Sequence, residues 1–157
     1  MEQIEKDLSN PMISRISITY IFLLFGIFNA NWVVRIPDLQ SVFSLSVGTL
    51  GLVLAGLPIG GFIILFFVGR FISVFGSKNM TMVGVLLLHL LYPLIFLMGN
   101  VPEVLVVLVL IGTSSTIMNI SMNSQGLTIE KDLQSSIISS LISLSLIILL
   151  LFSLLNL

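Results

Sequence analysis

The residues best suited to bind a solute are small polar side chains that recur along one stretch of the chain. They follow one another at spacings of three or four residues: Gly112, Ser115 or Thr116, Asn119 and Asn123. This spacing places them on one face of a helix, and two carboxamides on successive turns offer hydrogen-bond donors and acceptors together. Such a face in an apolar helix lines a path for a polar solute, or it joins neighbouring helices through hydrogen bonds. The residues alone leave both interpretations open.

Two further side chains could act with this face. Asn29 shares a helix face with Gly26 in the first apolar run, and we expect it to line the same path. His89 lies halfway along the third apolar run. A histidine at mid-membrane is a candidate proton site because it titrates near neutral pH. The alternative is a neutral histidine bonded to a neighbouring carbonyl group.

The sequence offers no other reactive group of residues. It has no cysteine and one histidine, so we expect no disulfide, thiolate or metal site. It contains no nucleophile–base pair and no phosphate-binding glycine loop with a lysine. We therefore expect a protein that is not an enzyme and that has no catalytic residues and no cofactor.

Composition indicates which elements position these residues. The chain is 57% hydrophobic and 8% charged, against about 25% charged residues in a soluble domain. With a net charge of -1, we expect no nucleic acid partner. Five apolar runs are each close to the ~20 residues that cross a bilayer as a helix: 16–34, 47–69, 79–98, 104–122 and 136–157. The sequence predicts an all-α polytopic bundle of about five transmembrane helices over 16–157, after a head over 1–15.

The cations predict the orientation of this bundle, because cytoplasmic loops are rich in Lys and Arg. A cytoplasmic head puts five cations on the inner side, which are Lys6, Arg15, Arg70, Lys78 and Lys131. Only Arg35 then lies outside. We expect a multi-pass protein of the cell (plasma or inner) membrane with a cytoplasmic N-terminus. Its loops are expected at 35–46, 70–78, 99–103 and 124–135.

Small residues in the second helix predict close helix contacts. Gly48, Gly51 and Ala55 form one stripe, and Gly56 with Gly60 forms another. Small residues four apart let helix backbones approach each other in lipid. Pro58 and the Gly60-Gly61 pair are expected to bend this helix. The bend serves packing alone, or it lets the helix rock during transport.

The stretch Gly69-Arg-Phe-Ile-Ser-Val-Phe-Gly-Ser-Lys78 resembles the G-x-L-x-D-R-x-G-R-R loop between helices two and three of the major facilitator superfamily. The family's Asp and Arg positions hold Ser73 and Val74 in this chain. The resulting inner-loop motif comprises Gly69, Arg70, Gly76 and Lys78.

Two other stretches resemble one branch of this superfamily, the bacterial inner-membrane permeases related to fucose permeases. One is the first-helix stretch from Phe22 to Asp38, and the other is Asn119-Ile-Ser-Met-Asn-Ser-Gln-Gly126, which is similar to their D-x-x-M-N-x-Q-G. Asn123 matches the family asparagine, and Asn119 replaces the acid.

The resemblance implies a fold of twelve helices in two halves, with the solute held between them. Because five runs are predicted here, we expect a truncated N-terminal half, frame-shifted near Ser140, where Ser, Leu and Ile dominate the remaining sequence. Two functions follow. The first is an alternating-access permease component for a small polar solute such as a sugar, paired with a second permease half or another copy. The second is a non-transporting membrane protein that acts through helix–helix contacts.

Overall fold

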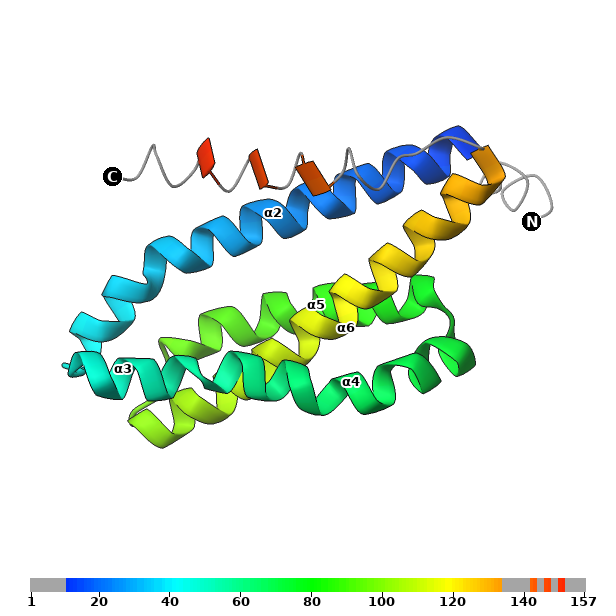
Figure 1. The fold of residues 1–157 in the computed structure, drawn as a ribbon. Helices are drawn as coiled ribbons and strands as arrows, with labels where there is room; N and C mark the ends of the chain where they lie inside the picture. Colours follow the sequence, from blue (N-terminus) through cyan, green and yellow to red (C-terminus); the bar gives the residue numbers. More distant parts are fainter. Residues whose placement is uncertain (1–10, 134–141, 144–145, 148–149, 152–157) are drawn as a thin grey trace. The chain divides into compact units, whose positions relative to one another are not determined.

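The computed structural model describes residues 11–133, 142–143, 146–147 and 150–151. These residues are helices joined by short connections, so the predicted all-α class is confirmed. The elements are α2 (Pro11–Val42), α3 (Val47–Leu54), α4 (Gly56–Phe75), α5 (Ser77–Ile95) and α6 (Val101–Leu133) (Figure 1). Of the predicted head, residues 1–10 lie outside the described part, and 11–15 belong to α2.

Four stretches of helix are long and apolar enough to cross a membrane: Ile16–Val42, Val47–Phe75, Ser77–Ile95 and Val101–Lys131. They correspond to the first four predicted runs. Most of the fifth predicted helix, 136–157, lies outside the described residues, and the six of its residues that are described are helical.

The chain divides into two compact units, Met1–Ile36 with Met122–Leu157, and Pro37–Ser121. We refer to them as unit 1 and unit 2. Unit 2 holds the last turns of α2, all of α3, α4 and α5, and the first twenty-one residues of α6. Unit 1 holds the rest of the two long helices α2 and α6.

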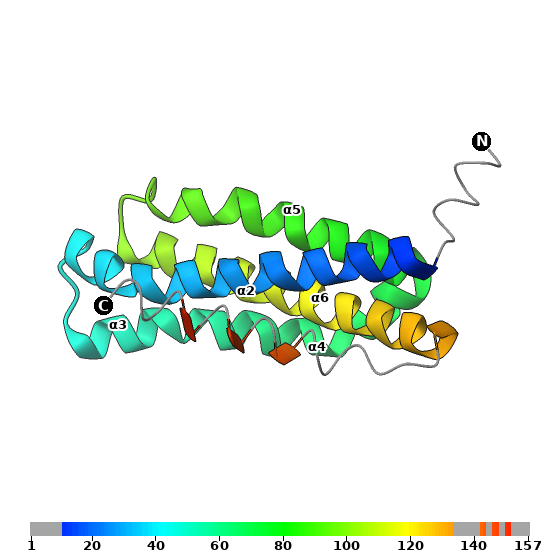
Figure 2. The same ribbon diagram turned by 90° about the horizontal axis from the view of Figure 1, so that it is seen from above.

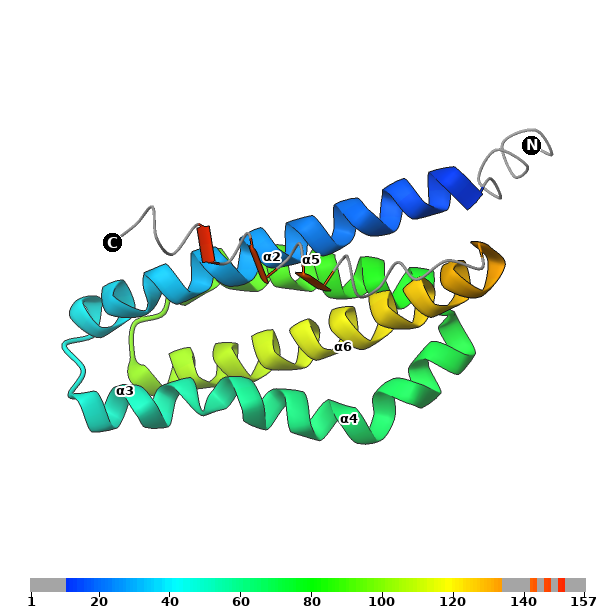
Figure 3. The ribbon, with the colours of Figure 1, turned by 45° about the horizontal axis from the view of Figure 1, so that its top comes forward.

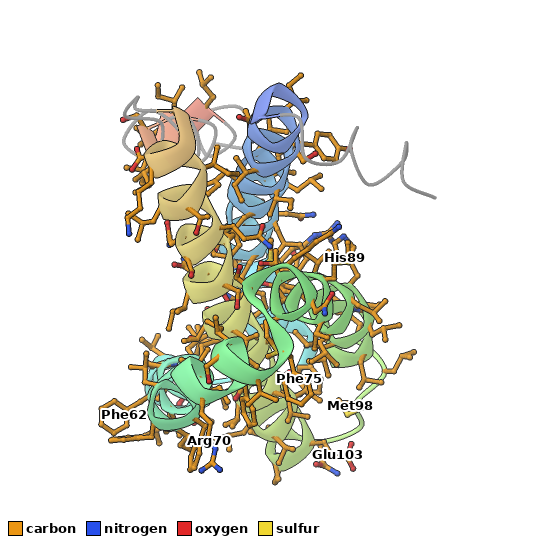
Figure 4. All side chains as sticks on the ribbon, turned by 90° about the vertical axis from the view of Figure 1, so that its right-hand side faces the viewer. Phe62, Arg70, Phe75, His89, Met98 and Glu103 are labelled. Carbon is orange, nitrogen blue, oxygen red and sulfur yellow. The ribbon has the colours of Figure 1, made fainter. Side chains whose placement is uncertain are left out.

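Within unit 2, α6 lies between α4 and α5 (Figure 2). A hydrophobic cluster joins the three helices near the α4–α5 turn: Ile64, Val68, Met80 and Ile117, with Ile72 and Ile120 at its edge. On the far side of α4, phenylalanine side chains are exposed, with Phe62 at 63% and Phe66 at 73%. Figure 4 shows Phe62 pointing away from α6. An apolar surface of this kind suits contact with lipid.

The helices extend beyond the apolar runs, so several predicted loops are wrong. α2 continues through the expected loop 35–46 as far as Val42. Pro37 deprives only one carbonyl, that of Val33, of its helical donor, and the exposed Arg35 and Asp38 are compatible with a helix that leaves the hydrocarbon. α6 likewise continues through the expected loop 124–135 to Leu133, and Gly126 lies inside it.

The predicted loop 70–78 is replaced by a single residue, Gly76. α4 ends at Phe75 and α5 begins at Ser77. Gly76 has φ 79° and ψ 149°, a backbone conformation that favours glycine. The connection between the two helices is therefore far shorter than the predicted loop.

The turn between α5 and α6 is shifted from the predicted 99–103 to residues 96–100. Asn100 Oδ1 accepts from the backbone N–H of Glu103 at 3.0 Å. The Glu103 carboxylate accepts from the N–H of Gly99 at 3.0 Å and from Asn100 Nδ2 at 2.7 Å. This reciprocal cap satisfies donors at the start of α6, and Pro102 lies in the first turn of this helix.

Candidate functional site

The small residues of α4 and α6 bring their backbones together (Figure 3). A Cβ atom at Gly60 would overlap the carbonyl oxygen of Val109, and one at Gly112 would overlap that of Leu57. A Cβ at Gly56 would lie 3.1 Å from the Leu105 carbonyl oxygen. The predicted stripe of Gly56 and Gly60 is therefore a packing surface, and its partner is α6.

The other predicted stripe makes no such close contact with the described residues. Gly48 and Gly51 are exposed. A Cβ at Gly51 would meet no heavy atom of the described chain within 4 Å, and one at Gly48 would only reach Ser46 Oγ at 4.0 Å. The predicted disturbance of this helix is found at Ala55, between α3 and α4. We attribute it to Pro58, because proline has no N–H to donate to the carbonyl of Leu54.

A hydrogen bond joins the same two helices. The Thr113 hydroxyl, half-buried, lies 3.1 Å from the carbonyl oxygen of Gly60 in α4 and 2.9 Å from that of Val109 in its own helix. Sequence reasoning missed Thr113, because it is about 100° away from Gly112 around the helix. Its signal was its position beside Gly112, at the point where α4 comes closest.

The polar face of α6 therefore divides into two parts. Gly112 packs against α4, and the Thr116 hydroxyl lies 2.7 Å from where a Cβ at Gly61 would be. This end of the face favours the interpretation as helix contact. Ser115 is half-buried.

The carboxamides lie further along α6. Asn119 and Asn123 are each half-buried, next to the buried Met118 and Met122. Asn119 belongs to unit 2, whereas Asn123 belongs to unit 1. Asn29 is also in unit 1 and half-buried, and its Nδ2 donates to the carbonyl oxygen of Phe25 at 2.7 Å. That bond occupies one of its donors and leaves the side-chain carbonyl oxygen to accept.

His89 lies on α5 with an exposed side chain (Figure 4). Its Nδ1 lies 2.8 Å from the carbonyl oxygen of Val85, one turn earlier. Since a carbonyl oxygen only accepts, the ring donates from Nδ1. This is the contact expected for the alternative in which histidine bonds to a neighbouring carbonyl.

Sequence reasoning also missed two buried hydroxyl side chains on α5 and α6, Thr81 and Ser121. A Cβ at Gly84 would lie 2.7 Å from the Met118 Cβ. The two helices are antiparallel. Thr81, three residues before Gly84, and Ser121, three residues after Met118, therefore lie at the same height along the helix pair. Both are fully buried. Thr81 donates to the Ser77 carbonyl oxygen at 2.9 Å, and Ser121 Oγ has no hydrogen-bond partner among the described residues.

The inner-loop motif lies at the α4–α5 turn of unit 2. Gly69 is exposed, and Arg70 and Lys78 have exposed side chains on either side of Gly76. Ser73, at the family's Asp position, donates to the Arg70 carbonyl oxygen at 2.8 Å. In the described part of the chain, no group of three or more His, Cys, Asp or Glu residues could hold a metal ion.

Comparison with known proteins adds one finding. No family model matches the chain, and no solved structure matches it. The chain is similar to Membrane protein MosC of Rhizobium meliloti, with 28% identity over 116 residues, which is 74% of this chain. It spans 28% of the length of that relative. Together with the four apolar spans, this similarity identifies the chain as a membrane protein whose helices contact the lipid bilayer.

Proposed function

We propose that the chain is a component of a permease of the major facilitator superfamily type, which moves a small polar solute such as a sugar by alternating access. The observation that carries the proposal is the pair of half-buried carboxamides, Asn119 and Asn123, on successive turns of an otherwise apolar membrane helix. Polar side chains inside a membrane helix commonly mark a solute path. We propose that Ser115, one turn before Asn119 on the same helix, lines this path with them.

Alternating access requires a second repeat against which the first can move. We propose that this partner is a second permease half or another copy of the chain. The chain spans 28% of a longer membrane protein to which it is similar, which is compatible with a role as one part of a larger membrane assembly. We also propose the inner membrane of a bacterial cell as its location, with a cytoplasmic N-terminus.

A second candidate function is a non-transporting membrane protein that acts through helix–helix contacts. The close glycine contacts of α4 and α6 and the Thr113–Gly60 hydrogen bond favour it, because they use part of the polar face for packing.

Solute binding distinguishes the two candidates. The purified chain in lipid nanodiscs is titrated with radiolabelled glucose, galactose and fucose. The permease proposal predicts saturable binding of one of these sugars, and about tenfold weaker binding after Asn119→Leu, since a lost buried hydrogen bond costs roughly 1–2 kcal/mol. The matched control is Asn31→Leu, because Asn31 is exposed on α2. Absence of saturable binding for all three sugars, or equal loss in both variants, would contradict the proposal.

A further inference from the structure

The formal charges of unit 2 are separated along its helices. Between Asp38 and Glu103 the sequence holds only two of them, Arg70 and Lys78. Both cations lie at the end of the unit where α4 turns into α5. Asp38 and Glu103 lie at the opposite end, where α3 and α6 begin. One end of this membrane unit therefore carries positive charge and the other carries negative charge.

Glu103 has hydrogen-bond partners within the protein, whereas the two cations have none among the described residues. The Glu103 carboxylate accepts two hydrogen bonds from the turn before α6. Within the described part of the chain, the side chains of Arg70 and Lys78 form no ion pair and no hydrogen bond. Both are exposed, so an anion outside the described chain can reach them.

The surroundings of Arg70 suit a lipid better than a water-soluble anion. Its neighbours one turn away on α4 are exposed and apolar: Phe66 at 73%, Phe67 at 54% and Val74 at 67%. In Figure 4 the Arg70 side chain points away from the ribbon. An arginine at the edge of an exposed apolar surface can lay its aliphatic stem along that surface. Its guanidinium group then extends from the hydrocarbon to the lipid headgroups.

The position of Arg70 along its helix agrees with the headgroup level. The span Val47–Phe75 has 29 residues, or about 43 Å at 1.5 Å per residue, whereas the hydrocarbon core is about 30 Å thick. The ends of the helix must therefore lie among the headgroups. Arg70 is five residues before the end of α4, close to this boundary.

We propose that Arg70 and Lys78 bind the phosphate headgroup of an anionic phospholipid whose acyl chains lie on Phe66, Phe67 and Val74. Each cation near an anionic membrane surface favours such lipids about fivefold. The site therefore selects phosphatidylglycerol over phosphatidylcholine, and it does so at this end of unit 2 alone. This inference is independent of solute transport.

Quenching by brominated lipids tests the site in place. Trp32 is the single tryptophan, so Trp32→Phe with Val74→Trp places a reporter next to Arg70. The matched control combines Trp32→Phe with Leu97→Trp, at an exposed position (76%) beyond the other end of α5. In phosphatidylcholine nanodiscs with added phosphatidylglycerol, we expect brominated phosphatidylglycerol to be enriched at least fivefold near position 74. Near position 97 we expect no enrichment.

The variant R70Q/K78Q should abolish the enrichment, and 10 mM inorganic phosphate at constant ionic strength should leave it unchanged. The proposal is overturned if both positions show the same enrichment, if R70Q/K78Q retains it, or if free phosphate removes it. Because Trp32 is buried and its replacement could unfold the protein, native mass spectrometry of the chain with Trp32 intact is the second measurement. There, R70Q/K78Q must retain fewer phosphatidylglycerol molecules but the same number of phosphatidylcholine molecules.

Discussion

At positions 60 and 112 the contact between α4 and α6 leaves no space for a side chain. Gly60→Ala should therefore force the two helices apart, and overpacking of this kind costs about 1–3 kcal/mol. Gly51→Ala is the matched control, since a Cβ there meets no heavy atom of the described chain within 4 Å. Unfolding by SDS, followed by circular dichroism in mixed micelles, measures both. Equal stability of the two variants would contradict the close contact.

Thr113 is a second residue expected to stabilise the contact between α4 and α6, through the hydrogen bond of its hydroxyl group. Thr113→Val keeps the shape of the side chain and removes its bond to the Gly60 carbonyl oxygen. We expect a loss of stability of about 0.6–2 kcal/mol in the same SDS titration, and Thr113→Ser should recover most of it. Thr128→Val is the control, because that exposed hydroxyl bonds only to Ser124 in its own helix. A loss as large in Thr128→Val would contradict the prediction.

Residue types predicted part of this contact. Gly56 and Gly60 are four apart, and that spacing was enough to predict close packing. The pattern could not identify α6 as the partner, because Gly48 and Gly51 show a similar spacing and remain exposed. Thr113 was missed for a related reason: a hydroxyl beside a face becomes a contact only when the neighbouring helix is very near.

At the level of elements, the break between α3 and α4 depends on Pro58. Pro58→Ala supplies an N–H for the Leu54 carbonyl, so α3 and α4 should join into one helix. Hydrogen–deuterium exchange should then slow over residues 54–59. Pro102→Ala is the control, because Pro102 lies in the first turn of α6, where an N–H has no helical acceptor. Unchanged exchange in Pro58→Ala would show that another residue causes the break.

The positions at which the helices end are the feature of the elements that the sequence predicts least well. The charge pattern predicts a helix end at Arg35 and another at Arg70. Charge ends the apolar run but leaves the backbone hydrogen bonds intact, so α2 continues to Val42 and α4 to Phe75. The cap of Asn100 and Glu103 was not predicted, although only local side-chain hydrogen bonds define it.

For the whole molecule, apolar runs predicted the all-α class and the first four spans, because crossing lipid requires about 20 apolar residues whatever the neighbours are. The division into two units inside α2 and α6 was not predicted. It depends on contacts between distant segments, and neither Ile36–Pro37 nor Ser121–Met122 interrupts its helix.

Membrane topology gives a prediction at the same scale. The chain has no cysteine, so Lys78→Cys and Asn100→Cys each provide one thiol, at exposed positions near opposite ends of α5. In intact spheroplasts a membrane-impermeant maleimide should label Asn100→Cys, and Lys78→Cys only after permeabilisation. Labelling of both from one side would contradict a spanning α5, and the reversed pattern would contradict a cytoplasmic N-terminus.

The single-residue turn at Gly76 also has a consequence for biosynthesis. Because no slack separates them, the end of α4 and the start of α5 must lie at the same depth in the bilayer. We therefore expect α4 and α5 to enter the bilayer as one helical hairpin.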